Sequence, residues 1–323
     1  MIKILQGNCI DKIKELDDNS IDCVVSSPPY FGLRDYGVDG QFGLEKTYHD
    51  YLANTVKVFK TFKPKLKDTA TIWWNVGDSY HNYRPTNNKQ GMYKKPDYPK
   101  QSIAGNRQDL PKHSLKRNQR YQEIKEKDLM MIPNRVAIAL QDAGWYIRSE
   151  IIWHKPNPMP ESVRDRPTSC HEKIWLITKN KKYYYDHEAI KEPAKDWGTR
   201  DRKKGSAFVD ATPGRSKQTG GKDCNFAEKG KNKRNVWTIT TKPFKDAHFA
   251  TFPKDLIEPC IKAGCPEGGV VLDPFGGSGT TGIVAALNNR NAILIELNQN
   301  YIDIANKRID KEVGLFNENI SSL

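Results

Sequence analysis

Short apolar runs alternate along the chain with segments of helical periodicity. The runs typical of buried strands lie at residues 2–5, 21–25, 69–76, 270–272 and 292–295. After the first of them, Ile10, Ile13 and Leu16 share one face of a predicted helix. Further helices are predicted over residues 48–63, 131–143 and 283–287, and another begins after Pro253. This alternation predicts an α/β fold with a mainly parallel, doubly wound sheet.

Two later strands are expected to break the parallel pattern. Residues 145–153 alternate as a strand, and residues 172–178 form another apolar run. A polar turn at 179–182 then returns the chain through Tyr183–Tyr185. The sequence therefore predicts an antiparallel hairpin at the edge of the sheet.

Residues 80–127 and 193–235 interrupt the regular pattern and have almost no aliphatic periodicity. They hold 12 basic against 4 acidic residues and 12 against 5, so together they carry more than the whole net charge of +13. Such an excess predicts a polyanionic partner. We interpret both stretches as basic insertions that would face a nucleic acid, within one discontinuous domain made of residues 1–79, 128–192 and 236–323. A solvated linker is the alternative for each stretch.

The six cysteines are scattered and form no Cys-x-x-Cys pair. This spacing predicts buried, reduced thiols and no zinc site. The chain begins at once with an apolar strand, so no signal peptide is expected, and no apolar run is long enough to span a membrane. These features together predict a cytoplasmic protein, and the basic excess predicts that it associates with a polyanion such as the DNA of the nucleoid.

A glycine-rich turn follows the apolar run at 270–272. Asp273 ends that run, and four of the seven residues at 276–282 are glycines. A phosphate-binding loop would need a lysine where Thr280 and Thr281 follow Gly279, and an acid before the turn would repel the pyrophosphate of a dinucleotide. A second acid, Glu296, ends the next apolar run, where a ribose diol would be held. The pattern favours a nucleotide-type cofactor that carries an amino group.

A second turn, Ser27-Pro28-Pro29-Tyr30, follows the apolar strand at 21–25. Taken by itself, it could also be a proline-rich turn or a polyproline ligand. Together with residues 273–281 it resembles the paired motifs of the S-adenosylmethionine-dependent DNA amino-methyltransferases, which read Ser/Asp/Asn-Pro-Pro-Tyr/Phe/Trp and Asp-Pro-Phe-x-Gly-Ser-Gly-Thr-Thr. Because the SPPY turn comes first, the order is similar to the circularly permuted, beta arrangement of that family. The resemblance covers residues 1–79, 128–192 and 236–310.

The resemblance implies a Rossmann-like methyltransferase fold, S-adenosylmethionine as cofactor, double-stranded DNA as partner and no metal. The catalytic residues it implies are Ser27, Pro28, Pro29 and Tyr30. The cofactor-binding residues are Asn8, Cys9, Phe249, Thr251, Phe252, Asp273, Pro274, Phe275, Gly276, Gly277, Ser278, Gly279, Thr280, Thr281 and Glu296. DNA contacts, and an affinity that falls steeply with salt, are expected from Arg34, Arg202, Lys203, Lys204, Arg215 and Lys217.

The implied reaction is methyl transfer to the exocyclic amine of a base flipped out of the duplex. The Ser27 hydroxyl and the Pro28 carbonyl would accept hydrogen bonds from the two N–H groups, and Tyr30 would stack on the base. In the family a serine at the first position usually accompanies cytosine N4, whereas Asp or Asn accompanies adenine N6, so Ser27 favours cytosine. Adenine N6, an RNA or protein substrate, and a DNA-binding protein without activity are the alternatives.

Two further features bear on this interpretation. Pro259-Cys260 has the form of the nucleophile of cytosine C5 methyltransferases, but it falls inside a predicted helix, and we expect a buried structural cysteine there. A restriction endonuclease of matching specificity would be a natural partner of such a DNA methyltransferase.

Overall fold

The computed structural model describes residues 1–34, 36–38, 40–81, 123–193, 230–241 and 252–320, with side chains described as far as residue 314. Within these ranges one sheet has the strand order β1-β8-β7-β2-β3-β5-β4-β6. Its strands are β1 (Ile2–Gln6), β2 (Ile21–Ser26), β3 (Leu66–Val76), β4 (Tyr146–His154), β5 (His171–Thr178), β6 (Val236–Thr238), β7 (Val270–Asp273) and β8 (Asn291–Glu296).

The strand order reverses between β7 and β2. The segment from β7 to β8 runs toward one edge of the sheet, and the segment from β2 to β3 runs toward the other. Strands β1, β8, β7, β2 and β3 are all parallel. Ligands of such sheets bind outside the carboxyl ends of the strands at the reversal point. The predicted α/β fold with a mainly parallel sheet is confirmed.

Strand β5 is the reversed strand, and it is antiparallel to both β3 and β4. The predicted return strand at Tyr183–Tyr185 is wrong, because β3 and β4 already occupy both hydrogen-bonding edges of β5. The backbone N–H of Tyr184 instead donates to the carbonyl of Thr69 (2.9 Å), and the Tyr185 ring stacks near Trp73 with centroids 6.4 Å apart. The edge is formed by β6, which is parallel to β4.

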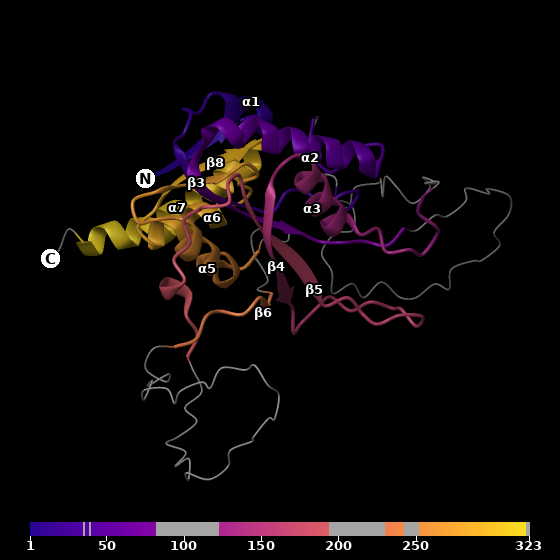
Figure 1. The fold of residues 1–323 in the computed structure, drawn as a ribbon. Coiled ribbons are helices and arrows are strands. Elements are labelled where there is room, and N and C mark those ends of the chain that lie inside the picture. Colours follow the sequence, from indigo (N-terminus) through magenta and orange to yellow (C-terminus); the bar gives the residue numbers. More distant parts are fainter. Residues whose placement is uncertain (35, 39, 82–122, 194–229, 242–251, 321–323) are drawn as a thin grey trace, which may run out of the picture.

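Helices cover both faces of the sheet (Figure 1). They are α1 (Cys9–Lys14), α2 (Tyr48–Phe62), α3 (Ile132–Asp142), α5 (Lys254–Gly264), α6 (Thr280–Leu287) and α7 (Gln299–Ile320), with short 3-10 turns at Lys63–Lys65 and Glu188–Ile190. One apolar cluster joins α1, α2 and α3 to the sheet, and a second joins α5 and α6 to the opposite face. The longest helix of the described ranges, α7, was not predicted from the sequence.

The chain ends that flank each basic stretch are held side by side. Tyr80 forms a bridge with Leu129, and the N–H of His81 donates to the carbonyl of Asp128 at 2.8 Å. Glu192 and Lys231 exchange two backbone hydrogen bonds of 2.9 and 2.8 Å around the other stretch. The described residues on either side of each stretch therefore lie next to each other in the sheet domain.

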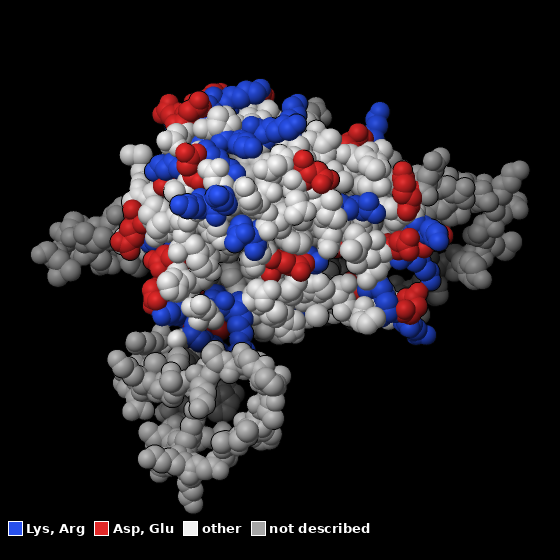
Figure 2. Space-filling view, in the orientation of Figure 1, with Lys and Arg blue, Asp and Glu red and all other residues white. Residues whose placement is uncertain are grey.

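On the face drawn in Figure 2, the Lys and Arg of the described residues are interspersed with Asp and Glu and do not form a separate positive patch. None of the helices in the described ranges has the length and apolar character needed to cross a membrane.

Candidate active site

The two sequence motifs meet at the point where the strand order reverses. The SPPY turn follows β2 and the glycine turn follows β7, and these two strands pair directly. The Ser26 hydroxyl, at the last residue of β2, donates to the carboxylate of Asp273 at 2.6 Å. Thus a single hydrogen bond between residues 247 positions apart joins the predicted catalytic turn to the predicted cofactor turn.

Asp273 is an internal link of the site as well as a candidate ligand. Its side chain is 1% exposed and also accepts hydrogen bonds from the hydroxyl of Thr281 (2.5 Å) and the N–H of Phe275 (3.0 Å). Burial raises the pKa of the Asp273 carboxyl to about 6, despite these hydrogen bonds. A cation bound beside this carboxyl would favour its charged form.

Glu296 ends β8 next to the glycine turn. Its two oxygens accept from the backbone N–H groups of Gly277 (2.9 Å) and Asn298 (2.8 Å), and burial raises the pKa of its carboxyl. The carbonyl of Glu296 accepts from the N–H of Gly7 at 3.0 Å, which brings the turn after β1 to the same edge. Asn8 caps α1 there by accepting from the N–H of Ile10 (2.9 Å), and the adjacent Cys9 is buried.

Packing explains most of the glycines in the turn. A Cβ at Gly276 or at Gly282 would lie 2.9 Å from Leu294, and one at Gly279 would lie 3.0 Å from Ala305 of α7. Gly277 differs, because no atom of the described residues lies closer than 3.9 Å to its Cβ position; its φ of +50° is left-handed, as is the φ of Gly279 at +81°. Three glycines therefore permit close packing of β8 and α7, and Gly277 is the one that leaves open space.

The SPPY turn ends in a polar cluster around the Tyr30 hydroxyl. This hydroxyl donates to Glu172 at the start of β5 (2.6 Å), lies 3.1 Å from the amide oxygen of Asn75, and accepts from the Ser27 hydroxyl at 3.2 Å. Glu172 also forms an ion pair with Lys155. Burial, and then the charge of Glu172, raise the pKa of the Tyr30 phenol well above its usual value, so it stays protonated.

Gly77 makes room for the Tyr30 ring. A Cβ at Gly77 would lie 2.5 Å from one ring carbon of Tyr30. Four residues of this cluster were not predicted as site residues: Asn75, Gly77, Lys155 and Glu172. The strands beside them were predicted, since Asn75 and Gly77 lie at the end of β3 and Glu172 lies at the start of β5.

The other predicted residues lie in different places. Phe275 lies at the site and packs against Phe42 and Trp74, with ring centroids 5.3 and 6.1 Å apart. Phe252 packs on the cluster beneath α5. Arg34 is close enough to Tyr36 and Tyr301 to oppose the rise that burial causes in the pKa of their phenols. Phe249, Thr251, Arg202, Lys203, Lys204, Arg215 and Lys217 lie outside the described residues.

Cys260 has no access to the site. It lies within α5, is 1% exposed and donates to the carbonyl of Leu256 at 3.5 Å. Burial raises the pKa of its thiol far above the usual range, so the nucleophilic thiolate is disfavoured. The expectation of a buried structural cysteine is confirmed.

Arg308 of α7 holds the glycine turn from the side of the helix and was missed by the sequence reasoning. Its Nη1 donates to the carbonyl and hydroxyl of Ser278 (2.6 and 2.8 Å) and to the hydroxyl of Thr280 (3.0 Å). Glu312 contacts Arg308 at 3.5 Å and also pairs with Lys254 at the start of α5. No local motif marks an arginine in a C-terminal amphipathic helix as part of a cofactor site.

We expect Arg308→Gln to weaken cofactor binding about tenfold or more, because Nη1 shares its two hydrogens among three acceptors of the turn and losing even one hydrogen bond from a charged donor costs about 1.5–3 kcal/mol. Isothermal titration calorimetry measures the affinity. Lys307→Gln, which removes an exposed cation from the same helix, is the matched control and should leave the affinity unchanged. Equal losses in both variants would contradict the prediction, because they would indicate a general effect of charge.

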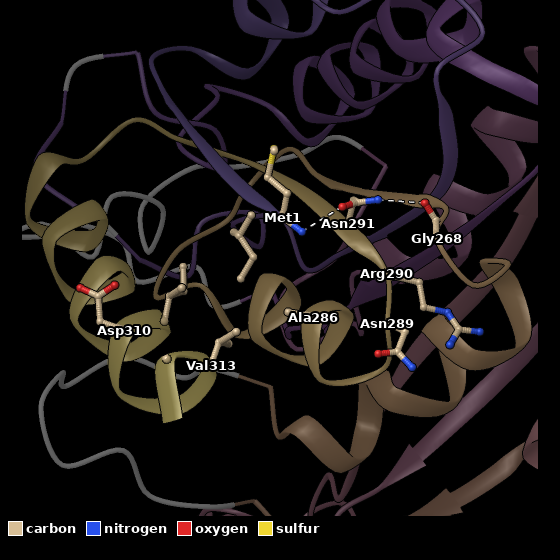
Figure 3. A pocket seen from close by; sticks show the side chains of 11 residues that line it. Met1, Gly268, Ala286, Asn289, Arg290, Asn291, Asp310 and Val313 are labelled. Carbon is tan, nitrogen blue, oxygen red and sulfur yellow. Dashed lines mark hydrogen bonds between the residues drawn. The ribbon is translucent and has the colours of Figure 1, made fainter. Parts of the chain in front are cut away.

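A large hollow in the described residues lies at the amino ends of the strands, away from the candidate active site (Figure 3). Its volume is about 550 Å³, and it is lined among others by Met1, Gly268 and Asn291, at the starts of β1, β7 and β8, and by Asp310 of α7. The terminal amine of Met1 donates to Asn291, which donates to the carbonyl of Gly268 (2.9 Å for each). The carboxyl ends of the strands, where the two motifs meet, are elsewhere, so this hollow is not part of the candidate active site.

The residues at the carboxyl ends of β7 and β8 fit S-adenosylmethionine. This cofactor carries a positive sulfonium and a positive amino group, and the site offers it two carboxyls whose pKa values burial has raised. Gly277 provides the open backbone position between them. A pyrophosphate would be repelled by the same pair of acids, so the geometry agrees with the choice of cofactor made from the motifs.

The chain matches the model of the N6/N4 methyltransferase family, described as DNA methylase, over residues 21–307, and it therefore belongs to this family of DNA-methylating enzymes. The prediction of an S-adenosylmethionine-dependent DNA amino-methyltransferase is confirmed.

Similar proteins agree with this family. The Type II methyltransferase M.SmaI from Serratia marcescens is 43% identical over 95% of this chain and 90% of its own. M.Cfr9I from Citrobacter freundii is 42% identical over 96% of this chain and 88% of its own.

Solved structures share the fold at low identity. The PvuII DNA methyltransferase (cytosine-N4-specific) has a TM-score of 0.62 at 17% identity, over 95% of this chain and 86% of its own. A putative DNA modification methylase from Thermus thermophilus, complexed with S-adenosyl-L-methionine, has a TM-score of 0.56 at 20% identity, over 97% of this chain and 96% of its own.

Proposed function

We propose that the protein transfers a methyl group from S-adenosylmethionine to the exocyclic N4 of cytosine in double-stranded DNA. The observation that carries the proposal is the serine at the catalytic position: Ser27 directly follows β2, beside the strand whose end holds the cofactor turn. Its hydroxyl is a small acceptor, which suits an amine on the smaller pyrimidine ring. The cytosine-N4-specific PvuII enzyme has the same fold, so this framework accommodates that chemistry.

The residues act by accepting hydrogen bonds and by alignment. The Ser27 hydroxyl and the Pro28 carbonyl accept from the two N–H groups of the amine, which directs the nitrogen lone pair toward the cofactor. Tyr30 stacks on the base after it leaves the duplex. The cofactor supplies a methyl group activated by a positive sulfur, so placing the nitrogen in line provides most of the acceleration.

The basic insertions at 80–127 and 193–235 supply DNA affinity in this proposal. The paired chain ends at Tyr80–Leu129 and Glu192–Lys231 support the assignment, because they allow each insertion to vary without disturbing the sheet. The likeness to Type II methyltransferases supports a restriction endonuclease of matching specificity as the protein's partner in the cell.

The modified base identifies the target atom directly. DNA from cells that express this chain would be digested to nucleosides and analysed by mass spectrometry, with cells expressing Ser27→Ala as the control. N4-methylcytosine in the first sample only is the expected result. N6-methyladenine without N4-methylcytosine would overturn the cytosine assignment and leave the DNA methyltransferase class standing.

A further inference from the structure

The cluster around Tyr30 has a fixed direction of hydrogen bonding. Glu172 forms an ion pair with Lys155, in which the two side chains are 16% and 19% exposed, and a carboxylate accepts hydrogen bonds at both oxygens. The Tyr30 hydroxyl has one hydrogen, and the contact to the charged carboxylate is the shorter of its two acceptor contacts, 2.6 Å against 3.1 Å to Asn75. Its oxygen is then free to accept from Ser27.

This direction determines what Ser27 can do. A serine hydroxyl has one hydrogen and two lone pairs, and here the hydrogen points to Tyr30 at 3.2 Å. The lone pairs are therefore left for another donor. If the hydrogen of the Ser27 hydroxyl pointed toward the target amine, it would face the N–H groups of that amine. Because this hydrogen is directed to Tyr30, the Ser27 oxygen can accept a hydrogen bond from the amine.

We propose that Ser27, Tyr30 and Glu172 form a hydrogen-bonded relay that orients the Ser27 hydroxyl and carries away the proton that the amine loses. This inference rests on the proposed catalytic role of Ser27. Tyr30 thus has a second role besides stacking, and Glu172 is a positioning residue and the final proton acceptor.

Atoms and charges balance across the transfer. The bond between sulfur and the methyl carbon breaks and leaves its electron pair on sulfur, while the lone pair of the amine nitrogen forms the new bond to carbon. The nitrogen then gives one proton to Oγ of Ser27, Ser27 gives its hydroxyl proton to Tyr30, and Tyr30 gives its own to Glu172. Glu172 becomes a neutral acid beside Lys155, whose positive charge favours release of that proton to water once the product leaves.

Two variants separate the relay from stacking and folding. Tyr30→Phe keeps the ring and removes one oxygen, and Glu172→Gln removes the charge at nearly constant size. We expect each to lower the single-turnover rate of methyl transfer about tenfold or more, and the cofactor affinity to stay within about twofold. The probe is unmethylated bacterial genomic DNA with radiolabelled S-adenosylmethionine, and Tyr146→Phe, at an exposed tyrosine of β4, is the matched control.

The double variant provides the decisive comparison. Residues of one relay act as a unit, so Tyr30→Phe with Glu172→Gln should be no slower than the slower single variant. Losses that multiply, or an unchanged rate in Tyr30→Phe, would overturn the relay. If Glu172→Gln fails to fold, the Tyr30→Phe rate alone still decides, because that variant removes only the hydroxyl. A wild-type chain that methylates no DNA would instead overturn the proposed function.

Discussion

Ser27→Ala is expected to lower the rate of methyl transfer about 100-fold or more while changing the affinity for S-adenosylmethionine less than about twofold. The variant removes an acceptor that acts on the amine of the base. The hydrogen bond of the Ser27 hydroxyl runs to Tyr30 and away from the cofactor turn, so the cofactor site should stay intact. Single-turnover methylation gives the rate, and calorimetry gives the affinity.

The preceding residue offers a matched control. Ser26 is also a serine, but it is buried and its hydroxyl donates to Asp273 at 2.6 Å. Ser26→Ala should therefore weaken cofactor binding and lower stability by about 1 kcal/mol, because Asp273 loses one hydrogen bond in a buried site. If both variants changed rate and affinity alike, Ser27 would be a structural residue and the catalytic assignment would fail.

Asp273→Asn should weaken cofactor binding about tenfold to 100-fold at neutral pH, because a full negative charge beside the cationic cofactor is lost. Asparagine is a better test than alanine, since it keeps an oxygen that can accept from Ser26 and Phe275, which hold the turn together. Calorimetry at constant ionic strength measures the change, and thermal unfolding checks that the variant is folded.

The affinity of the wild-type protein for the cofactor should depend on pH through the same carboxyl of Asp273. The pKa of the Asp273 carboxyl is about 6 in place of 3.8, because burial disfavours its charged form. If the charged form binds the cofactor, affinity should fall about tenfold per pH unit below pH 6 and level off above it. Asp273→Asn should flatten this profile, leaving the smaller contribution of Glu296. A steep profile that survives in the variant would contradict the assignment.

The stability of the cofactor-free protein should fall as pH rises, whereas its affinity for the cofactor should rise. Between about pH 4 and 6 the folded protein binds the Asp273 proton more tightly than the unfolded chain does, so the contribution of this group to stability falls as pH rises through that window. The loss is complete above about pH 6 and is on the order of 3 kcal/mol. Saturating cofactor should offset it, which chemical unfolding with and without the cofactor would measure.

The sequence by itself determined the parts of the fold that have local signatures. Apolar runs place the buried strands to within a few residues, because a parallel strand covered on both faces must be apolar. The two turns are recognisable from consecutive residues, and both lie at the predicted ends of β2 and β7. The basic excess of residues 80–127 and 193–235 is likewise a property of composition alone. From these features the fold class and the family were correctly predicted.

Only the tertiary structure decided how strand β5 pairs. The sequence indicates a strand at residues 172–178, but any strand can offer its edges to several partners. The apolar residues at 145–153 and 69–76 both pair with it, and Tyr183–Tyr185 does not. Pairing is decided by which edges remain open in the assembled sheet, and a local pattern does not contain that information.

The polar contacts of the site were likewise decided in three dimensions. Tyr30 and Glu172 are 142 positions apart, and Ser26 and Asp273 are 247 apart, so no spacing in the sequence could pair them. Arg308 reaches the glycine turn from a helix that packs closely on it, since Ala305 of the same helix lies 3.0 Å from where a Cβ on Gly279 would be. The sequence thus supplied the reacting groups, and the packing of strands and helices fixed the direction of their hydrogen bonds, because those bonds depend on atoms that meet only after folding.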